Sequence, residues 1–409
     1  MDRREFVAVT GAALATAAGT RRNPSTLTAI PSFRPSVALQ EPSFSPAVFT
    51  ARIDKARAGL TAAKLDLLVA TPSTNYEYLT GYNPGRSERL IALFVPVKGD
   101  PVIVCPAFEV ERLKAHSVPA DLRPWEEDKD PFKVVHDVAR EFKPLHRRGQ
   151  VGLEPTTAYQ TLLRLVDKMD NWEFHPTDAL FRELRIVKAP EEVVMIRRAV
   201  AIIEDAIAAT FAQLAAGMTE RDVAAALSAE VSKRGSSGGG LVQFGTSSAL
   251  PHGGPAASAL TRETVVLIDA GARVSGYTSD ITRTIWWGDT PSDEFKKVFN
   301  TVHDAQTAAM QLGKPLVTLC EEMDAAARAA ITTAGYGQFF THRLGHGLGM
   351  DGHEDPYLVK GDTTRLEPGM VFTIEPGIYQ LGKFGVRIED DCVMTDAGVE
   401  VLSHRPAKF

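Results

Sequence analysis

The sequence predicts an α/β (α+β) protein of two domains, and the larger, C-terminal domain should consist of two similar halves related by a pseudo-twofold axis. Three observations predict this. The chain has 409 residues, too many for one compact core. Strand-like and helix-like stretches alternate over residues 47–183. Over residues 184–409 the order helix, helix, strand, strand occurs twice.

The composition excludes several classes of protein. Hydrophobic residues make up 44% of the chain, charged residues 23%, and the net charge is −6, as in an ordinary globular protein. Acids and bases are interspersed, so we expect no nucleic-acid partner. The three cysteines (Cys105, Cys320 and Cys392) lie far apart and predict neither a disulfide framework nor a cysteine zinc site. No run of 18 uncharged apolar residues occurs, and we expect no stable membrane span.

The N-terminus has the layout of an export signal. Arg3 and Arg4 precede Phe6 and a mildly apolar, alanine-rich stretch, which resembles a twin-arginine signal peptide over residues 1–20. The alternative is a plain disordered tail that happens to contain two arginines. Residues 21–46 are rich in Pro, Ser and Thr and are typical of a linker. We therefore expect a periplasmic, cell-envelope or extracellular protein.

The domain expected at residues 47–183 contains no cluster of catalytic residue types. Either Ser73 or Thr74 can cap a short helix, and Lys98-Gly99-Asp100 separates two apolar stretches in the manner of a hairpin. The predicted elements are helices at 51–64 and 73–79, strands at 65–70 and 151–154, and hairpin strands at 90–95 and 101–104.

The domain expected at residues 184–409 contains an internal repeat. In each half an acidic helix start leads to two helices separated by a glycine, and a second glycine ends the second helix. In the first half, Gly235 and the glycines that follow it are predicted to end the second helix. The first half is predicted as helices at 190–216 and 219–233 with strands at 264–270 and 277–287, and the second as helices at 292–312 and 316–334 with strands at 370–375 and 386–394.

Four carboxylates occur at the ends of these strands. Asp269 ends the run Val265–Ile268, and antiparallel pairing with the returning strand can bring Asp280 beside it. Glu375 and Glu389 occupy the corresponding positions in the second half. Four buried, unpaired carboxylates would repel one another at a cost of several kcal/mol each. Divalent metal ions would remove this cost.

His346, flanked by glycines that permit a close approach, is the fifth candidate ligand. Oxygen ligands with one imidazole suit Mn²⁺ best, with Co²⁺ and Zn²⁺ as alternatives. Two metals about 3.5–4 Å apart would share a bridging water and acidify it, and the resulting hydroxide could attack an amide carbonyl.

Each of these residues has a plainer reading when taken alone. A strand-end acid is more often a cap or an ion-pair partner, and a lone histidine is more often structural. The set of four acids, two in each half, with one glycine-flanked histidine makes the metal reading the better one. His252, His342 and His353 can each move a proton or hold substrate, although each alone is more often a satisfied polar residue.

Together these motifs resemble the pita-bread metallopeptidases, the group of methionine aminopeptidase, aminopeptidase P and prolidase. The resemblance covers about 225 C-terminal residues well. It is carried by Ile268-Asp269-Ala270-Gly271, Asp280-Ile281-Thr282-Arg283-Thr284, His342-Arg343-Leu344-Gly345-His346-Gly347, His353-Glu354, Thr373-Ile374-Glu375-Pro376-Gly377 and Val386-Arg387-Ile388-Glu389-Asp390.

The resemblance implies a role for each matching residue. Asp269, Asp280, His346, Glu375 and Glu389 would bind two metals, with Thr282 steadying a carboxylate. Glu375 would also shuttle a proton. His252 and His353 would bind substrate and stabilise the tetrahedral intermediate. His342 and Arg387 would help to hold substrate near the metals, and Tyr277 would line the pocket.

The additional N-terminal domain is similar to that of the creatinase, prolidase and aminopeptidase P branch. Creatinase-like members lack the metal acids that this chain has, which leaves an Xaa-Pro dipeptidase or an Xaa-Pro aminopeptidase. The implied substrates are small peptides with proline at the second position, and the implied assembly is a homodimer. Two alternatives stay open: a non-catalytic peptide-binding protein on the same fold, and a metal-dependent hydrolase of another amide or a phosphoester.

Overall fold

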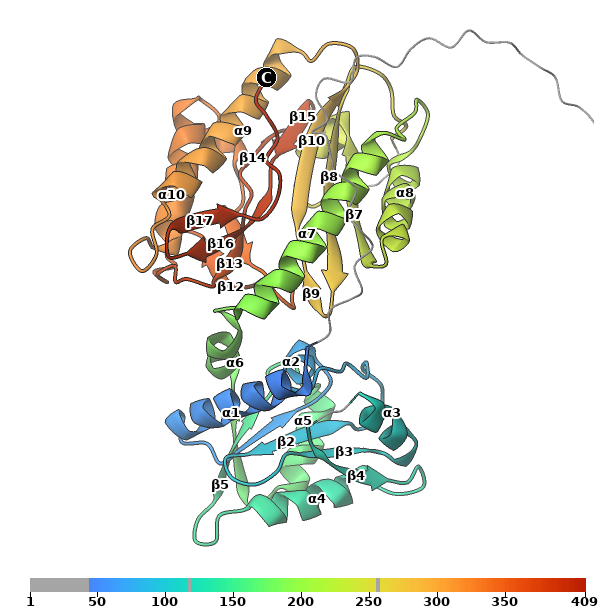
Figure 1. Cartoon of the computed structure of the whole chain (residues 1–409), viewed down its shortest axis with the longest axis vertical. Helices are drawn as coiled ribbons and strands as arrows, with labels where there is room; N and C mark the ends of the chain where they lie inside the picture. Colours follow the sequence, from blue (N-terminus) through green and yellow to red (C-terminus); the bar gives the residue numbers. More distant parts are fainter. Residues whose placement is uncertain (1–43, 117–118, 255–257) are drawn as a thin grey trace, which may run out of the picture. The chain divides into compact units, whose positions relative to one another are not determined.

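The computed structural model describes residues 44–116, 119–254 and 258–409 (Figure 1). The predicted signal peptide and nearly all of the predicted linker lie outside these residues. The first helix, α1 (Pro46–Ala62), begins before the predicted residue 51, and proline at its first turn suits that position because its missing N–H has no partner there anyway.

The N-terminal domain is built on a six-stranded mixed sheet (Figure 1). The predicted hairpin is confirmed, since its two strands pair antiparallel with Leu93 opposite Ile103. The outer strands β4 and β6, which sequence reasoning missed, each pair parallel with a neighbour. In spatial order the strands are β4 (Asp121–Trp125), β3 (Val102–Pro106), β2 (Ala92–Pro96), β1 (Leu67–Ala70), β5 (Gly149–Leu153) and β6 (Trp172–Pro176).

Helices pack around this sheet. The predicted cap of the second helix is confirmed, because the Ser73 hydroxyl accepts a hydrogen bond of 3.1 Å from the Tyr76 amide. The remaining helices of the domain are α2 (Thr74–Thr80), η1 (Ala107–Glu109), α3 (Val110–Ala115), α4 (Pro131–Phe142), α5 (Tyr159–Lys168) and α6 (Asp178–Arg185).

The first half of the C-terminal domain contains the predicted helix pair and strands, together with one strand that was not predicted. The helices α7 and α8 lie against the strands β7 and β8 (Figure 1). The elements are α7 (Pro190–Phe211), α8 (Glu220–Lys233), β7 (Ser237–Phe244), η2 (Gly245–Ala249), β8 (Thr264–Val274), β9 (Tyr277–Thr278) and β10 (Ile281–Trp287).

The glycines after Gly235, which the sequence predicts to end a helix, also form part of an additional strand, β7. It pairs antiparallel with β8, with Gly240 opposite Ala270. A Cβ atom at Gly240 would lie 2.0 Å from the Asp269 carbonyl oxygen, so only glycine permits this approach of the two backbones. The glycines therefore bring β7 against the strand that carries Asp269.

The second half repeats the helix pair. Ser292 caps α9 (Asp293–Leu312) next to the predicted helix start at residue 292, accepting a 3.2 Å hydrogen bond from the Phe295 amide. Helices α9 and α10 lie beside a five-stranded sheet of order β12-β11-β13-β16-β17, and β14 and β15 form a separate hairpin. The elements are α9 (Asp293–Leu312), α10 (Cys320–Thr333), η3 (Gly337–Phe339), β11 (Gly345–Gly347), β12 (Glu354–Leu358), β13 (Val371–Ile374), β14 (Gly377–Gln380), β15 (Phe384–Arg387), β16 (Asp390–Thr395) and β17 (Gly398–Val401).

The predicted fold class is confirmed: a mixed α/β N-terminal domain precedes a C-terminal domain with two helix-pair-and-sheet halves. Apolar side chains of the helix pairs pack on the sheets, as Phe295 and Val298 of α9 do in the second half. Within the described part of the chain, none of the helices has the length and apolar character needed to cross a membrane.

Candidate metal centre

Three of the four predicted carboxylates lie at strand ends or strand connections, and the fourth, Asp269, lies in the interior of a strand that continues past the predicted residue 270. Asp269 lies within β8, and Asp280 lies between β9 and β10. Glu375 directly follows β13, and Glu389 separates β15 from β16. His346 is the central residue of β11. Each half of the domain thus contributes two carboxylates, as the sequence predicts.

Backbone pairing explains why these residues meet. Thr282 on β10 lies opposite Asp269 on β8. The Glu389 amide donates a 3.2 Å hydrogen bond to the Thr282 carbonyl oxygen, which ties the second half to the first. The Thr282 hydroxyl also donates to the Glu389 carboxylate at 2.5 Å. Thr282 therefore fixes this carboxylate in place.

Ligand atoms of the five residues gather in overlapping groups. Within each group these atoms lie within 4.8 Å of one another: one group is Asp269, Asp280 and Glu389, and another is His346, Glu375 and Glu389. His346 Nε2 lies 3.3 Å from Glu375 Oε1 and 3.9 Å from Asp280 Oδ2. Glu389 belongs to both groups and so joins two potential metal positions.

Burial and mutual repulsion disfavour the charged form of these acids. Burial, together with the neighbouring Glu389, raises the pKa of Asp280 and of Glu375 well above the usual range. Burial, followed by the charge of Asp269, raises the pKa of Glu389 to about 7. A cation between the carboxylates would reverse this effect by favouring the ionised forms.

His346, the histidine of the cluster, is suited to bind a metal as a neutral imidazole. Burial lowers the pKa of His346 to about 3, with a further contribution from His353. His346 Nδ1 lies 3.1 Å from the Gly347 carbonyl oxygen, so a proton on Nδ1 would leave Nε2, the atom facing Glu375, free to bind a metal. The donor set of carboxylate oxygens with one imidazole fits a pair of hard or borderline divalent ions.

Arg387 is bound to the acids rather than open to a ligand. Its Nη2 atom lies 2.6 Å from Asp269 Oδ2, and its Nε atom donates to the Thr282 hydroxyl at 3.0 Å. The side chain is buried. These contacts orient Asp269, and the substrate contact expected of Arg387 stays a prediction.

Tyr379, which sequence reasoning missed, connects two of the predicted residues. Its hydroxyl oxygen lies 2.8 Å from Arg387 Nη1 and 2.8 Å from His342 Nε2. Burial lowers the pKa of His342 to about 4, with Arg387 adding to the effect. His342 is therefore a neutral ring next to the cluster. Tyr379 lies in an unpredicted hairpin, and its spacing gave no signal for this role.

His353 lies beside the cluster. Its ring centroid is 4.0 Å from that of His346, and its ligand atom shares a 4.8 Å group with Asp280 and His346. Burial lowers its pKa, with Arg343 contributing. His252 is exposed, and the preceding Pro251 carbonyl oxygen lies 3.4 Å from an Arg387 nitrogen. His353 thus lies beside the cluster, and the residue before His252 lies against Arg387, which contacts Asp269.

The predicted pocket residue Tyr277 has different partners. Its hydroxyl donates to the Glu192 carboxylate and accepts a 2.8 Å hydrogen bond from Arg52. The ring is buried. The structure therefore gives the Tyr277 hydroxyl a place in a buried ionic network with Arg52 and Glu192, and its contact with substrate stays a prediction.

Asp391 also escaped sequence reasoning. Its Oδ2 atom accepts a 3.0 Å hydrogen bond from the Asp280 amide, which places the backbone of that acid. The residue is fully buried, and burial raises its pKa well above the usual range. It follows Glu389-Asp390 in the sequence, and only tertiary pairing distinguishes its role from that of its neighbours.

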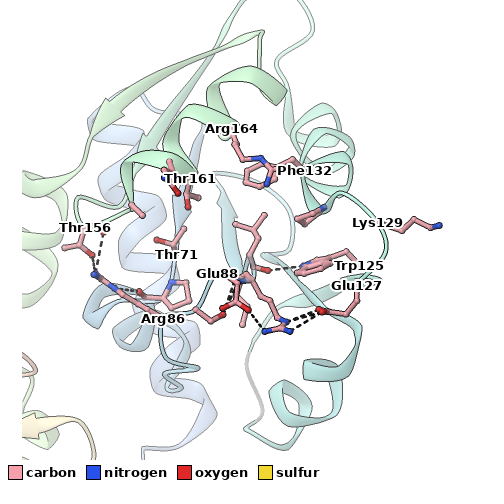
Figure 2. A pocket seen from close by; sticks show the side chains of 18 residues that line it. Thr71, Arg86, Glu88, Trp125, Glu127, Lys129, Phe132, Thr156, Thr161 and Arg164 are labelled. Carbon is pink, nitrogen blue, oxygen red and sulfur yellow. Dashed lines mark hydrogen bonds and ion pairs between the residues drawn. The ribbon is translucent and has the colours of Figure 1, made fainter.

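The N-terminal domain holds a separate cavity of about 430 Å³, shown in Figure 2. Two of its arginines have acidic partners: Arg89 lies 3.0 Å from Glu127, and Arg164 lies 2.6 Å from Asp130. Arg86 donates a 2.7 Å hydrogen bond to the Thr156 hydroxyl. None of the five candidate metal ligands lines this cavity.

Two family descriptions match the chain. Residues 194–396 match metallopeptidase family M24, and residues 52–187 match the creatinase/prolidase N-terminal domain. The first match contains all five residues of the acid and histidine cluster.

Characterised relatives match over nearly their whole length. The Xaa-Pro dipeptidase of Lactobacillus helveticus is 35% identical over 358 residues, which cover 86% of this chain and 96% of the relative. The solved prolidase of Thermococcus sibiricus has a TM-score of 0.81 and 32% identity, covering 90% of this chain and 99% of that one. The X-Pro aminopeptidase of Thermotoga maritima has a TM-score of 0.76 and 29% identity, with 86% and 99% covered. The chain therefore belongs to metallopeptidase family M24 and carries the creatinase/prolidase N-terminal domain in front of its peptidase domain.

Proposed function

We propose that this metallopeptidase hydrolyses the Xaa-Pro peptide bond of small peptides with two divalent metal ions, Mn²⁺ above all. The observation that carries the proposal is the group of Asp269, Asp280, His346, Glu375 and Glu389, all buried or partly buried, whose ligand atoms meet in overlapping triads. Relatives named as Xaa-Pro dipeptidase and prolidase support the choice of substrate.

The metals would be held by these five residues, with Asp280 and Glu389 placed to serve both positions. When bound, such ions would lower the pKa of a water molecule and polarise the substrate carbonyl. The tertiary amide before proline has no N–H, and a pocket can select it by shape.

The residues of this chain supply orientation and proton transfer. Arg387 and Thr282 fix the carboxylates of Asp269 and Glu389. Glu375, which directly follows β13, would take a proton from the attacking water and return it to the leaving nitrogen. His353 lies next to His346, where it can stabilise charge that develops on the carbonyl oxygen.

A paired assay tests this proposal. The purified chain would be given an Xaa-Pro dipeptide and an Xaa-Pro-Xaa tripeptide, each with Mn²⁺ and with chelator. We expect chelator-sensitive cleavage. Cleavage of the dipeptide alone identifies a dipeptidase, and cleavage of the tripeptide identifies an aminopeptidase. If neither is cleaved by protein with two metals bound, the Xaa-Pro assignment is wrong.

The proposal extends to the setting of the enzyme. The arginine pair and apolar stretch at the N-terminus support export by a twin-arginine route, which moves folded proteins and would allow the metals to be loaded first. Fractionation of cells producing the chain with and without Arg3→Lys and Arg4→Lys tests this. Sedimentation tests the homodimer that the family resemblance implies.

A further inference from the structure

The segment that carries His353, residues 349–355, comprises most of the connection from β11 to β12 and the first two residues of β12. It is held by charged residues from the end of α6 and the connection to α7. Arg185 is the last residue of α6, and Lys188 precedes α7 by two positions. Neither residue belongs to the metal centre.

Glu354 forms ion pairs with two cationic side chains, Arg185 and Lys188, and these three residues make up an ionic clamp. The Glu354 Oε2 atom lies 2.5 Å from Arg185 Nη2, and its Oε1 atom lies 2.7 Å from Lys188 Nζ. All three side chains are nearly inaccessible: Glu354 is 10% exposed, Arg185 is 11% exposed and Lys188 is 2% exposed. Both carboxylate oxygens of Glu354 are thus engaged in a site with little water.

The same arginine holds the segment at a second point. Arg185 Nη2 lies 2.6 Å from Asp351 Oδ2, and Arg185 Nη1 donates to Asn75 Oδ1 at 2.7 Å. Thr74 donates from its hydroxyl to Asp351 Oδ1 at 2.6 Å. His353 therefore lies between two acids, Asp351 and Glu354, that are both fixed by Arg185.

The packing leaves this segment little freedom. A Cβ atom at Gly349 would lie 2.6 Å from Glu354 Oε1 and 3.0 Å from Lys188 Cε, so the backbone lies directly against the ion pair. In this conformation the cations of Arg185 and Lys188 are paired with the carboxylates of Asp351 and Glu354. Removing one partner would leave a buried charge unpaired, which is far more costly than the loss of a surface ion pair.

We propose that Arg185, Lys188 and Glu354 are positioning residues that hold His353 beside His346. The inference rests on the proposed function for its kinetic consequences, but the holding of the segment can be measured without turnover. A displacement of about 1 Å at a catalytic group can reduce a rate by about 100-fold, so a loosened segment should affect kcat more than metal binding.

Glu354→Gln is the variant that tests the proposal, and the chain offers a closely matched control. Glu230 on α8 is also 10% exposed and also binds one lysine and one arginine, Lys233 and Arg234, each at 2.7 Å. We expect Glu354→Gln to lower kcat on an Xaa-Pro dipeptide by about 100-fold at unchanged metal content. Glu230→Gln, with the same chemical change at the same exposure, should leave kcat within about twofold.

A double-mutant cycle separates positioning from general destabilisation. If Glu354 acts through His353, Glu354→Gln should cost little further activity once His353→Ala is present. Costs that multiply would overturn the proposal. Arg185→Lys, which keeps the charge but cannot reach Asp351, Glu354 and Asn75 together, is a milder second variant should Glu354→Gln fail to fold, and we expect about a tenfold loss of kcat.

Amide hydrogen exchange of the metal-loaded protein gives a readout that does not depend on activity. Amides of residues 350–353 should exchange at least about tenfold faster in Glu354→Gln than in the unsubstituted chain and in Glu230→Gln. Unchanged exchange would overturn the proposal even if peptides are cleaved. Faster exchange in a protein that cleaves no Xaa-Pro peptide would support the clamp and refute the proposed function instead.

Discussion

At the scale of single residues, the centre depends on carboxylates that are unfavourable in the absence of a cation. Glu389 is buried, Asp280 and Glu375 are partly buried beside it, and desolvation raises the pKa of each. Neutral His346 adds a ligand without adding charge. The cluster is therefore predisposed to bind cations and should make stability depend on both pH and metal.

The titration of Glu389 gives a prediction for the metal-free protein. Its pKa rises from 4.5 to about 7 on folding, so the folded state holds the proton more tightly and stability falls as pH increases through this range. Glu389→Gln removes this titration. Between pH 4.5 and 7 we expect the free energy of unfolding of the unsubstituted chain to fall relative to that of the variant, which also loses the effect of the Glu389 charge on Asp280 and Glu375.

Denaturant unfolding of both proteins in chelator, at several pH values, measures this difference. Comparing the two curves cancels the opposing titration of the buried histidines, whose lowered pKa values make stability rise with pH below 6.5. Parallel curves for the two proteins would contradict the prediction.

The hydroxyl of Tyr379 provides a second prediction at this scale. Tyr379→Phe leaves the buried groups of Arg387 and His342 without a shared partner. We expect a loss of about 1–3 kcal/mol in the free energy of unfolding. Tyr357→Phe, at a half-buried ring stacked under Arg343, is the control and should change it by less than about 0.5 kcal/mol. Equal effects of the two substitutions would show that the Tyr379 hydroxyl has no special role.

At the scale of elements, sequence patterns predicted what depends on local chemistry. The capped helices α2 and α9 and the apolar strands β1 and β8 begin or run close to where the spacing indicated. The strand β7 was missed because its three successive glycines look like a break, and their purpose appears only when β8 lies alongside. The short strands β14 and β17 carry no clear period of their own. Tyr379 and Asp391 were missed because their roles depend on partners from other segments of the chain.

The close approach of β7 to β8 can be tested by substitution. Gly240→Ala would place a methyl group 2.0 Å from the Asp269 carbonyl oxygen and force the two strands apart. We expect a cost of about 1–3 kcal/mol in unfolding free energy, together with weaker metal binding because Asp269 moves. Gly335→Ala, at φ +88° with open space around it, isolates the cost of a left-handed backbone and should leave metal affinity unchanged. Unaltered metal affinity in Gly240→Ala would contradict this account.

At the scale of the whole molecule, two halves that each begin with a helix pair and continue with strands contribute to one set of ligands. The repeat, the acids and the histidine were all visible in the sequence. Asp269 and Glu375 directly follow apolar runs, and Asp280 and Glu389 lie at the strands expected to return beside them. What the sequence could not supply is how the centre is supported: Arg387 on Asp269, Asp391 under Asp280, and the ionic clamp around His353. These contacts join segments more than 100 residues apart in the first two cases.

The measurement that tests the central claim most directly is the number of metal ions bound per chain, taken together with cleavage of an Xaa-Pro dipeptide, for the unsubstituted protein and for Asp280→Ala. The account predicts about two ions and chelator-sensitive cleavage in the former. In the variant it predicts fewer ions and a loss of about 1,000-fold in kcat, because Lewis-acid stabilisation is worth several kcal/mol. Full metal content and full turnover in Asp280→Ala would contradict the two-metal assignment.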